Sequence, residues 1–315
     1  MRLHPLVVIL GPTASGKTKI AVELAAKMGG EIISGDSMQI YRDMDIGTAK
    51  IKPTETKGVP HHLLDIKNPD EPFSVAEFQN IARSKIVEIT QKGKLPFIVG
   101  GTGLYIQAVI DPYQFTEQKN VLPYRSKLFA LAEEKGEDYL FQLLRNIDPV
   151  SAEKIHPHDR KRVCRALEYY HLTGKTISQN TKAAEHKESL YNLALVGLTL
   201  DRSLLYQRIE QRVDQMMAAG FLEEVKGLLS KGYSPDLPAM QGIGYRELCR
   251  YLHEEYALKE AVALIKQETR RFAKRQLTWF KRDQRIKWFA TDHLEQNFEK
   301  RTLEIMDFIG RTIGL

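Results

Sequence analysis

The sequence predicts an α/β fold in which a parallel β-sheet is flanked by helices and a helical domain is inserted into the chain. Three observations lead to this prediction. Short apolar runs in the first third of the chain alternate with helix-forming segments, a pattern that gives a parallel sheet covered on both faces. A glycine-rich loop joins the first of these runs to its helix. The middle of the chain is polar, charged and helix-patterned, without comparable apolar runs.

Length and composition are those of a globular protein. The 315 residues suffice for a large core and two units, and 43% of them are hydrophobic and 27% charged. No apolar run approaches the roughly 20 residues of a membrane-spanning helix, and too few residues precede the first strand for a cleavable signal. Cys164 and Cys249 lie far apart, without metal-ligand spacing. We expect a cytoplasmic monomer that does not contact a membrane.

The first predicted strand, 6–10, and the first predicted helix, 19–28, enclose a phosphate-binding loop. The connecting residues fit the P-loop pattern G-x-x-x-x-G-K-[ST] and are Gly11, Pro12, Thr13, Ala14, Ser15, Gly16, Lys17 and Thr18. Backbone N–H groups in such a loop point at phosphate oxygens, while Lys17 adds a positive charge and Thr18 offers its hydroxyl to Mg²⁺. The core is therefore P-loop NTPase-like and should hold a diphosphate. No long apolar strand ends in a metal-binding acid, which disfavours a motor ATPase or a switch GTPase.

The second predicted strand, 31–34, leads to Asp36 at the carboxyl edge of the sheet, where ligands of open α/β folds bind. Asp36 is a candidate general base for an N–H or O–H acceptor, or an indirect partner of Mg²⁺. The alternative is a residue that only caps a turn or a helix.

The third predicted strand, 95–99, follows a helix at 75–91 and ends in a second glycine loop. Thr102 in this loop could bond a phosphate or the acceptor, or the loop could simply permit a tight turn. A further strand is expected at 193–198. Beyond it, Arg208 and Arg212 lie four residues apart and share a helix face, either to clamp a pyrophosphate or to face solvent.

The inserted domain is predicted at 113–191, between two parts of a P-loop core at 1–112 and 192–315. Its helices are expected at 124–134, 139–146 and 159–172. The basic run 160–165 could form a lid over phosphate, a surface for nucleic acid, or a solvated helix face.

The C-terminal part is predicted to be helical, with helices at 203–219, 222–230 and 258–280. Residues 266–287 contain nine basic side chains against two acids; Trp279 and Phe280 lie among them and Trp288 follows directly. Such a stretch is suited to a phosphate backbone and to stacking on bases. The alternative is that the aromatic residues are core and the basic residues are merely exposed. The net charge of +6 permits a polyanionic partner without requiring one.

Seven motifs in order resemble those of the tRNA dimethylallyltransferase (isopentenyltransferase) family, along most of the chain. They lie at 11–18, 34–41, 44–50, 60–65, 99–105, 241–246 and 271–279. The chain ends without the zinc finger of some eukaryotic members, so it is similar to the bacterial form.

The resemblance implies transfer of a dimethylallyl group from dimethylallyl diphosphate to N6 of the adenosine 3′-adjacent to the anticodon in tRNA, with release of diphosphate. It implies that Lys17, Arg212, and Thr18 with Mg²⁺ neutralise the diphosphate. Asp36 would accept the N6 proton, with Thr102 and Arg125 beside the reacting centre. The positions that the resemblance assigns to tRNA contact are Asp36, Ser37, Met38, Gln39, Lys161, Arg162, Val163, Cys164, Arg165, Gln241, Gly242, Gly244, Tyr245, Arg246, Lys274, Arg275 and Arg282.

Three other functions compete with this one. A small-molecule or nucleotide kinase shares the P-loop, an acid after the second strand and an arginine-bearing helical lid. An RNA-binding protein with a vestigial loop is disfavoured because Lys17, Thr18 and Asp36 are all present. An enzyme of the same family acting on free AMP or ADP fits the basic C-terminal helix less well than one acting on tRNA.

Overall fold

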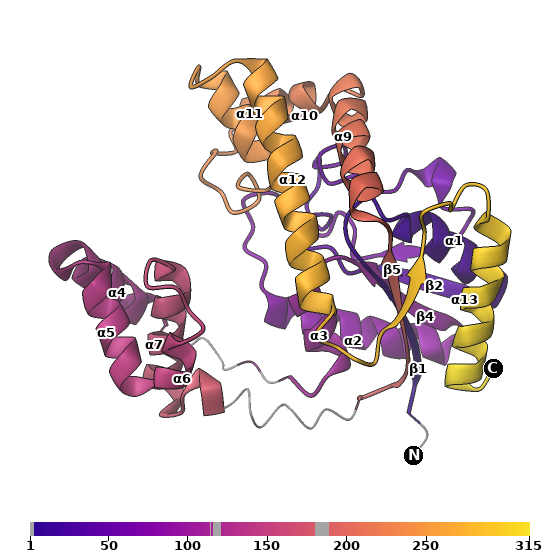
Figure 1. Cartoon of the computed structure of the whole chain (residues 1–315), viewed down its shortest axis with the longest axis horizontal. Helices are drawn as coiled ribbons and strands as arrows, with labels where there is room; N and C mark the ends of the chain where they lie inside the picture. Colours follow the sequence, from indigo (N-terminus) through magenta and orange to yellow (C-terminus); the bar gives the residue numbers. More distant parts are fainter. Residues whose placement is uncertain (1–2, 114, 116–120, 180–188) are drawn as a thin grey trace. The chain divides into compact units, whose positions relative to one another are not determined.

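The computed structural model describes residues 3–113, 115, 121–179 and 189–315 (Figure 1). The chain forms two compact units. One consists of 1–110 together with 189–315, and the other of 111–188. Within the described residues, no helix is both long and apolar enough to cross a bilayer.

A six-stranded, wholly parallel sheet forms the centre of the first unit, in the order β3-β2-β4-β1-β5-β6. Four strands lie where the apolar runs predict them. The two outer strands, β3 and β6, are too short to give a periodic signal of their own. The strands are β1 (Pro5–Leu10), β2 (Gly30–Ser34), β3 (His61–His62), β4 (Leu95–Gly100), β5 (Asn192–Thr199) and β6 (Lys287–Ala290).

Both faces of the sheet are covered by helices (Figure 1). Val7 and Ile9 of β1 pack on the side of α1 (Lys17–Met28) and α13 (Phe298–Ile313). Leu6, Val8 and Leu10 pack on the side of α2 (Val75–Gln91) and α3 (Gly103–Ile110). Alternating side chains of one strand thus enter two cores, which explains why the strand is apolar throughout.

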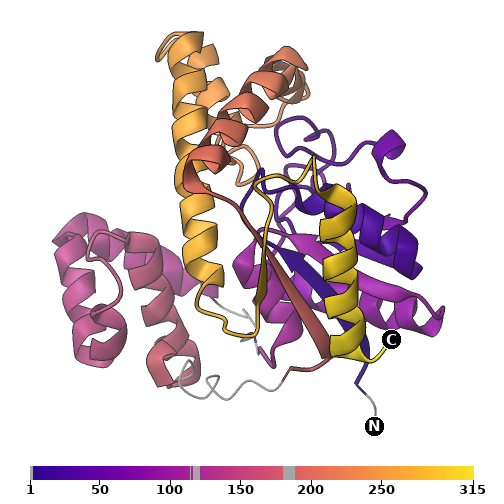
Figure 2. The same cartoon turned by 45° about the vertical axis from the view of Figure 1, so that its right-hand side comes forward.

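A helical cluster follows β5 and has a core of its own. It consists of α9 (Arg202–Ala218), α10 (Phe221–Ser230), α11 (Tyr245–Leu252) and α12 (Leu258–Phe280). Buried Phe221 and Tyr245 pack there with Ile40 and Met44, which come from the segment after β2. Figures 1 and 2 both show α12 beside α9, and α12 also contacts α3 at the edge of the sheet. The cluster is therefore built onto the loops at the carboxyl edge of the strands.

The second unit is helical. It contains α4 (Val121–Lys135), α5 (Glu137–Ile147), α6 (Pro149–Ala152) and α7 (Arg160–Thr173). The short 3₁₀ turn η1 (Pro53–Glu55) belongs to the first unit instead. Leu128, Leu140 and Leu144 are buried in its interior. The side chain of Asp159 accepts a hydrogen bond from the backbone N–H of Arg162 and caps α7. This unit has its own core and needs no strand.

Candidate active site

The P-loop is held in shape by glycine geometry and by close packing on β5. Gly11 and Gly16 have φ values of +149° and +85°, and α1 begins directly after the loop at Lys17. A Cβ atom on Gly11 would lie 2.5 Å from the carbonyl oxygen of Leu198, so only glycine fits there. The loop therefore presents its N–H groups from a rigid support.

Two basic side chains, Lys17 of the loop and Arg212 of α9, line the cavity next to it. Burial, and after it the charge of Arg212, lower the pKa of Lys17, while the charge of Asp36 raises it; the net result is a pKa of about 7. Burial also lowers the pKa of Arg212. The Nζ atom of Lys17 donates a hydrogen bond to the carbonyl oxygen of Pro12 at 2.7 Å. Like charges enclosed together in this way favour a bound anion.

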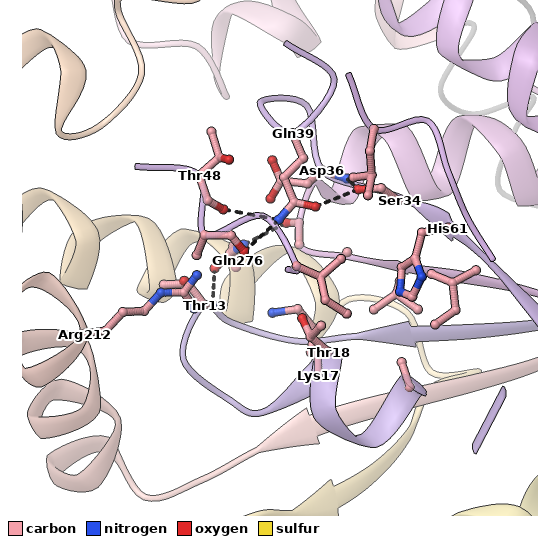
Figure 3. Close-up of a pocket in the computed structure, with 18 of the residues that line it drawn as sticks. Thr13, Lys17, Thr18, Ser34, Asp36, Gln39, Thr48, His61, Arg212 and Gln276 are labelled. Carbon is pink, nitrogen blue, oxygen red and sulfur yellow. Dashed lines mark hydrogen bonds between the residues drawn. The ribbon is translucent and has the colours of Figure 1, made fainter. Parts of the chain in front are cut away.

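Asp36 lies at the same cavity as Lys17, Thr18 and Arg212 (Figure 3). Its Oδ1 atom accepts a hydrogen bond from the backbone N–H of Met38 at 2.8 Å. Among the described residues, no group donates a hydrogen bond to Oδ2. One oxygen thus holds a turn, and the other is available to a ligand.

The remaining walls of the cavity combine apolar and polar side chains. The apolar ones are Ala21, Ile32, Ala49, Ile51, Leu64, Val99 and Phe272, and the polar ones are Ser34, Gln39, Thr48, His61 and Gln276. The cavity therefore offers both basic side chains and an apolar part of its wall, as a diphosphate bearing a hydrocarbon group requires.

Thr102 contacts Ser37, the residue that follows Asp36. Its hydroxyl oxygen accepts a hydrogen bond from the backbone N–H of Ser37 at 3.2 Å and lies 3.4 Å from the Ser37 hydroxyl. Thr102 is not among the described residues that line the cavity. It supports the turn that carries Asp36.

The sequence-based prediction missed Gln276, which joins α12 to the site. Its Oε1 atom accepts a hydrogen bond from the Thr13 N–H at 2.9 Å, and its Nε2 atom donates one to the Gly101 carbonyl at 2.9 Å. Its side chain is buried and lines the cavity (Figure 3). The available signal was its spacing, because Phe272, Gln276 and Phe280 recur every four residues on one face of the helix.

The positions assigned to tRNA contact divide into exposed and buried groups. Lys274, Arg275 and Arg282 are exposed, and no described acidic side chain forms an ion pair with them. Gln39 belongs to the cavity wall, where its Oε1 atom accepts a hydrogen bond from the Ser34 hydroxyl at 2.9 Å. The prediction that the Tyr245 side chain contacts tRNA is corrected, because this side chain is 1% exposed and packs in the core of the helical cluster.

In the second unit, two further predicted contacts need the same correction. Val163 and Cys164 point into the core of α4, α5 and α7, so their side chains serve packing, and the neighbouring Lys161 and Arg162 are exposed.

Arg125 forms a bidentate ion pair with the buried Glu168, at 2.5 and 2.7 Å. Arg165 lies 3.7 Å from the same carboxylate.

Comparisons with known proteins identify the family of the chain. The family model of IPP transferase matches residues 39–283. The chain belongs to the IPP transferase family. Two relatives in this family, each named tRNA dimethylallyltransferase, come from Moorella thermoacetica and Carboxydothermus hydrogenoformans. The first is 51% identical over 99% of this chain and 97% of its own length, and the second 53% over 97% of each.

Solved structures of IPP transferase relatives have the same fold. The full-length tRNA isopentenylpyrophosphate transferase of Bacillus halodurans is 46% identical, with a TM-score of 0.75 over 99% of this chain and 97% of its own. A eukaryotic dimethylallyltransferase acting on tRNA is 29% identical, with a TM-score of 0.81 over 98% of this chain and 80% of its own.

Proposed function

We propose that the protein transfers a dimethylallyl group from dimethylallyl diphosphate to N6 of the adenosine 3′-adjacent to the anticodon in tRNA, releasing diphosphate. The observation that carries the proposal is the convergence of Lys17, Asp36 and Arg212 on one cavity whose wall is partly apolar. Membership of the IPP transferase family and the names of the relatives support it.

The cationic end of the cavity suits the leaving group. An allylic carbon shares developing positive charge over three carbon atoms, so stabilising the negative charge on the departing diphosphate is the main catalytic task. Lys17 and Arg212 line the cavity, and together with the N–H groups of the P-loop they would stabilise this charge. A bound diphosphate would raise the pKa of Lys17 and keep it charged.

Asp36 is the proposed general base. In the transfer step, the N6–C1 bond forms, the bond between C1 and the diphosphate oxygen breaks, and the N6 proton passes to the Asp36 carboxylate. The lone pair of N6 is delocalised into the adenine ring, so removing this proton as the bond forms assists the attack. The Met38 N–H and the Thr102–Ser37 contact hold the turn in which Asp36 lies.

We also propose Mg²⁺ as cofactor. In phosphate sites Mg²⁺ is usually held by one or two protein oxygens together with substrate phosphates and water. Thr18 lines the same cavity as Asp36, and its hydroxyl would suit this role. The described residues contain no cluster of three or more His, Cys, Asp or Glu side chains suited to a metal, so the diphosphate would complete the coordination. When bound, Mg²⁺ adds positive charge at the leaving group.

Transfer RNA is the proposed acceptor because exposed cations lie on the same helix that lines the cavity. Lys274 and Arg275 are exposed on α12, while Phe272 and Gln276 of that helix line the cavity. A target base must leave its stack to reach such a cavity. Contacts to the phosphate backbone would hold the tRNA while one base enters.

The test is to incubate the protein with Mg²⁺, unmodified total tRNA, and either dimethylallyl diphosphate or ATP. The tRNA is then digested and its nucleosides are analysed by mass spectrometry. We expect an adenosine heavier by one dimethylallyl group in the first arm alone. ADP release in the ATP arm, without a modified nucleoside in either arm, would favour a kinase instead.

A further inference from the structure

Glu224 of α10 binds a turn of the backbone that no motif assigns to it. Its Oε2 atom accepts hydrogen bonds from the N–H groups of Asp45 and Ile46, at 2.9 and 2.6 Å. Its Oε1 atom accepts hydrogen bonds from the Gly47 N–H at 3.0 Å and from the Tyr245 hydroxyl at 2.7 Å. Three successive N–H groups form an anion-binding concavity, and a carboxylate from the same chain fills it.

The same face of α10 is also packed into this turn. A Cβ atom on Gly47 would overlap the Phe221 ring, and one on Gly244 would lie 2.5 Å from it. Phe221 also meets Tyr245 edge-on, with 5.0 Å between ring centroids. Phe221 and Glu224 therefore join two distant segments, 44–50 and 241–246, through one turn of a helix.

The turn held by Glu224 continues directly into the cavity wall. Thr48 and Ala49 line the cavity, and their carbonyl oxygens accept hydrogen bonds from Nε2 of Gln39 at 3.2 and 3.4 Å. Gln39 in turn receives the hydrogen bond from Ser34, at the end of β2. The chain of contacts from Glu224 to the donor cavity is therefore continuous.

We propose that Glu224 is a positioning residue that holds the 45–49 turn, and through it the wall of the donor cavity formed by Gln39, Thr48 and Ala49. The inference rests on the proposed function, because the cavity is taken to bind an allylic diphosphate. Glu224 does not touch the substrate. It sets the shape of the wall against which the substrate lies, and it keeps that wall in register with the segment that carries Tyr245.

The experiment measures the affinity for dimethylallyl diphosphate by calorimetry, and KM and kcat for both substrates. Glu224→Ala should weaken donor binding and raise the donor KM by about tenfold, with smaller changes in kcat and in the KM for tRNA. Glu224→Gln should be intermediate, because one oxygen still accepts two hydrogen bonds while the new NH₂ group faces N–H donors. Tyr245→Phe should have the smallest effect, because three of the four hydrogen bonds remain.

Glu223→Gln is the matched control. Glu223 precedes Glu224 on α10, is exposed, and pairs only with Lys226 among the described residues, at 2.9 Å. It should bind the donor like the wild type. Thermal unfolding would be followed in every variant. If Glu224→Ala does not fold, the donor affinities of Glu224→Gln and Tyr245→Phe test the proposal.

Donor affinity and KM in the folded Glu224 variants equal to those of the Glu223→Gln control would overturn the proposal. A wild-type protein that binds no dimethylallyl diphosphate would instead overturn the proposed function and this inference with it. A graded loss of donor affinity, with kcat largely kept, would distinguish positioning from a general loss of folded protein.

Discussion

Gln276 and Thr13 are 263 positions apart in sequence, yet the Gln276 side chain accepts a hydrogen bond of 2.9 Å from the backbone N–H of Thr13 in the P-loop. The same amide donates to the Gly101 carbonyl, so one buried side chain on α12 joins the two glycine loops of the site. The helix that carries the exposed cations therefore also shapes the diphosphate site.

Replacing Gln276 with Leu should destabilise the protein by about 1–3 kcal/mol. The substitution keeps much of the volume but leaves the part-buried N–H of Thr13 and the buried carbonyl of Gly101 without their partner. Denaturant unfolding measures the change, and the donor KM should rise with it. Thr278→Ala, at an exposed position of the same helix, is the control. Equal stability of the two variants would show that Gln276 contributes little.

Donor binding should be linked to proton uptake through Lys17. The pKa of this residue is about 7 in the free protein, and a bound diphosphate raises it. Near pH 6 the side chain is charged before and after binding, so it takes up almost no proton. Above about pH 8 it is mostly neutral before binding, so uptake should approach one proton. Calorimetry in buffers of different ionisation enthalpy measures this uptake.

The Lys17→Met variant separates this proton from any proton that the diphosphate itself gains. The variant should lose the difference in uptake between the two pH values. An unchanged difference would place the titrating group elsewhere. The same shift affects the free protein: between about pH 7 and 10.5 the unfolded state binds more protons at Lys17, so this residue makes stability rise with pH across that window.

Gly11→Ala should damage the P-loop. The new Cβ would meet the Leu198 carbonyl oxygen at 2.5 Å, in a backbone conformation that other residues rarely adopt. We expect a loss of about 1–3 kcal/mol in unfolding free energy and weaker donor binding. Gly227→Ala is a suitable comparison, because Gly227 lies inside α10 and a Cβ atom added there would have no described neighbour within 4 Å. It should be neutral or slightly stabilising.

Arg275→Ala should weaken tRNA binding and make its salt dependence shallower by about one unit of slope in log affinity against log salt. Arg275 is exposed on α12 and has no acidic partner among the described residues. Filter binding at several salt concentrations measures the slope. Arg311→Ala removes an exposed arginine of α13, where Asp307 is its partner, and should leave the slope unchanged. Equal slopes in both variants would remove Arg275 from the tRNA surface.

Local sequence signals predicted the elements that form the proposed diphosphate site. The buried, β-branched run of β1 and the P-loop after it are readable because strand, turn and helix follow one another within a few residues. Asp36 was predictable for the same reason, since it follows the end of β2. Strands β3 and β6 were not predictable, because two or four residues become a strand only through pairing with β2 and β5.

The side chains that join distant segments had no comparable signal. Gln276 and Glu224 find their partners 263 and 179 positions away, and nothing adjacent to either residue indicates those partners. At other positions, burial in the folded protein determined whether a side chain is exposed to a partner. Cys164 and Tyr245 lie within polar, charged segments but on the faces of α7 and α11 that pack inward, so tertiary packing set their role.

The most direct test of the account is the single-turnover rate of dimethylallyl transfer in Asp36→Asn, measured together with the affinities for tRNA and dimethylallyl diphosphate. The asparagine keeps the size of the side chain and an oxygen for the Met38 N–H but cannot accept the N6 proton. We predict that the transfer rate falls by about 100-fold or more while both affinities stay close to those of the wild type. A transfer rate equal to that of the wild type would contradict the assignment of Asp36 as the base.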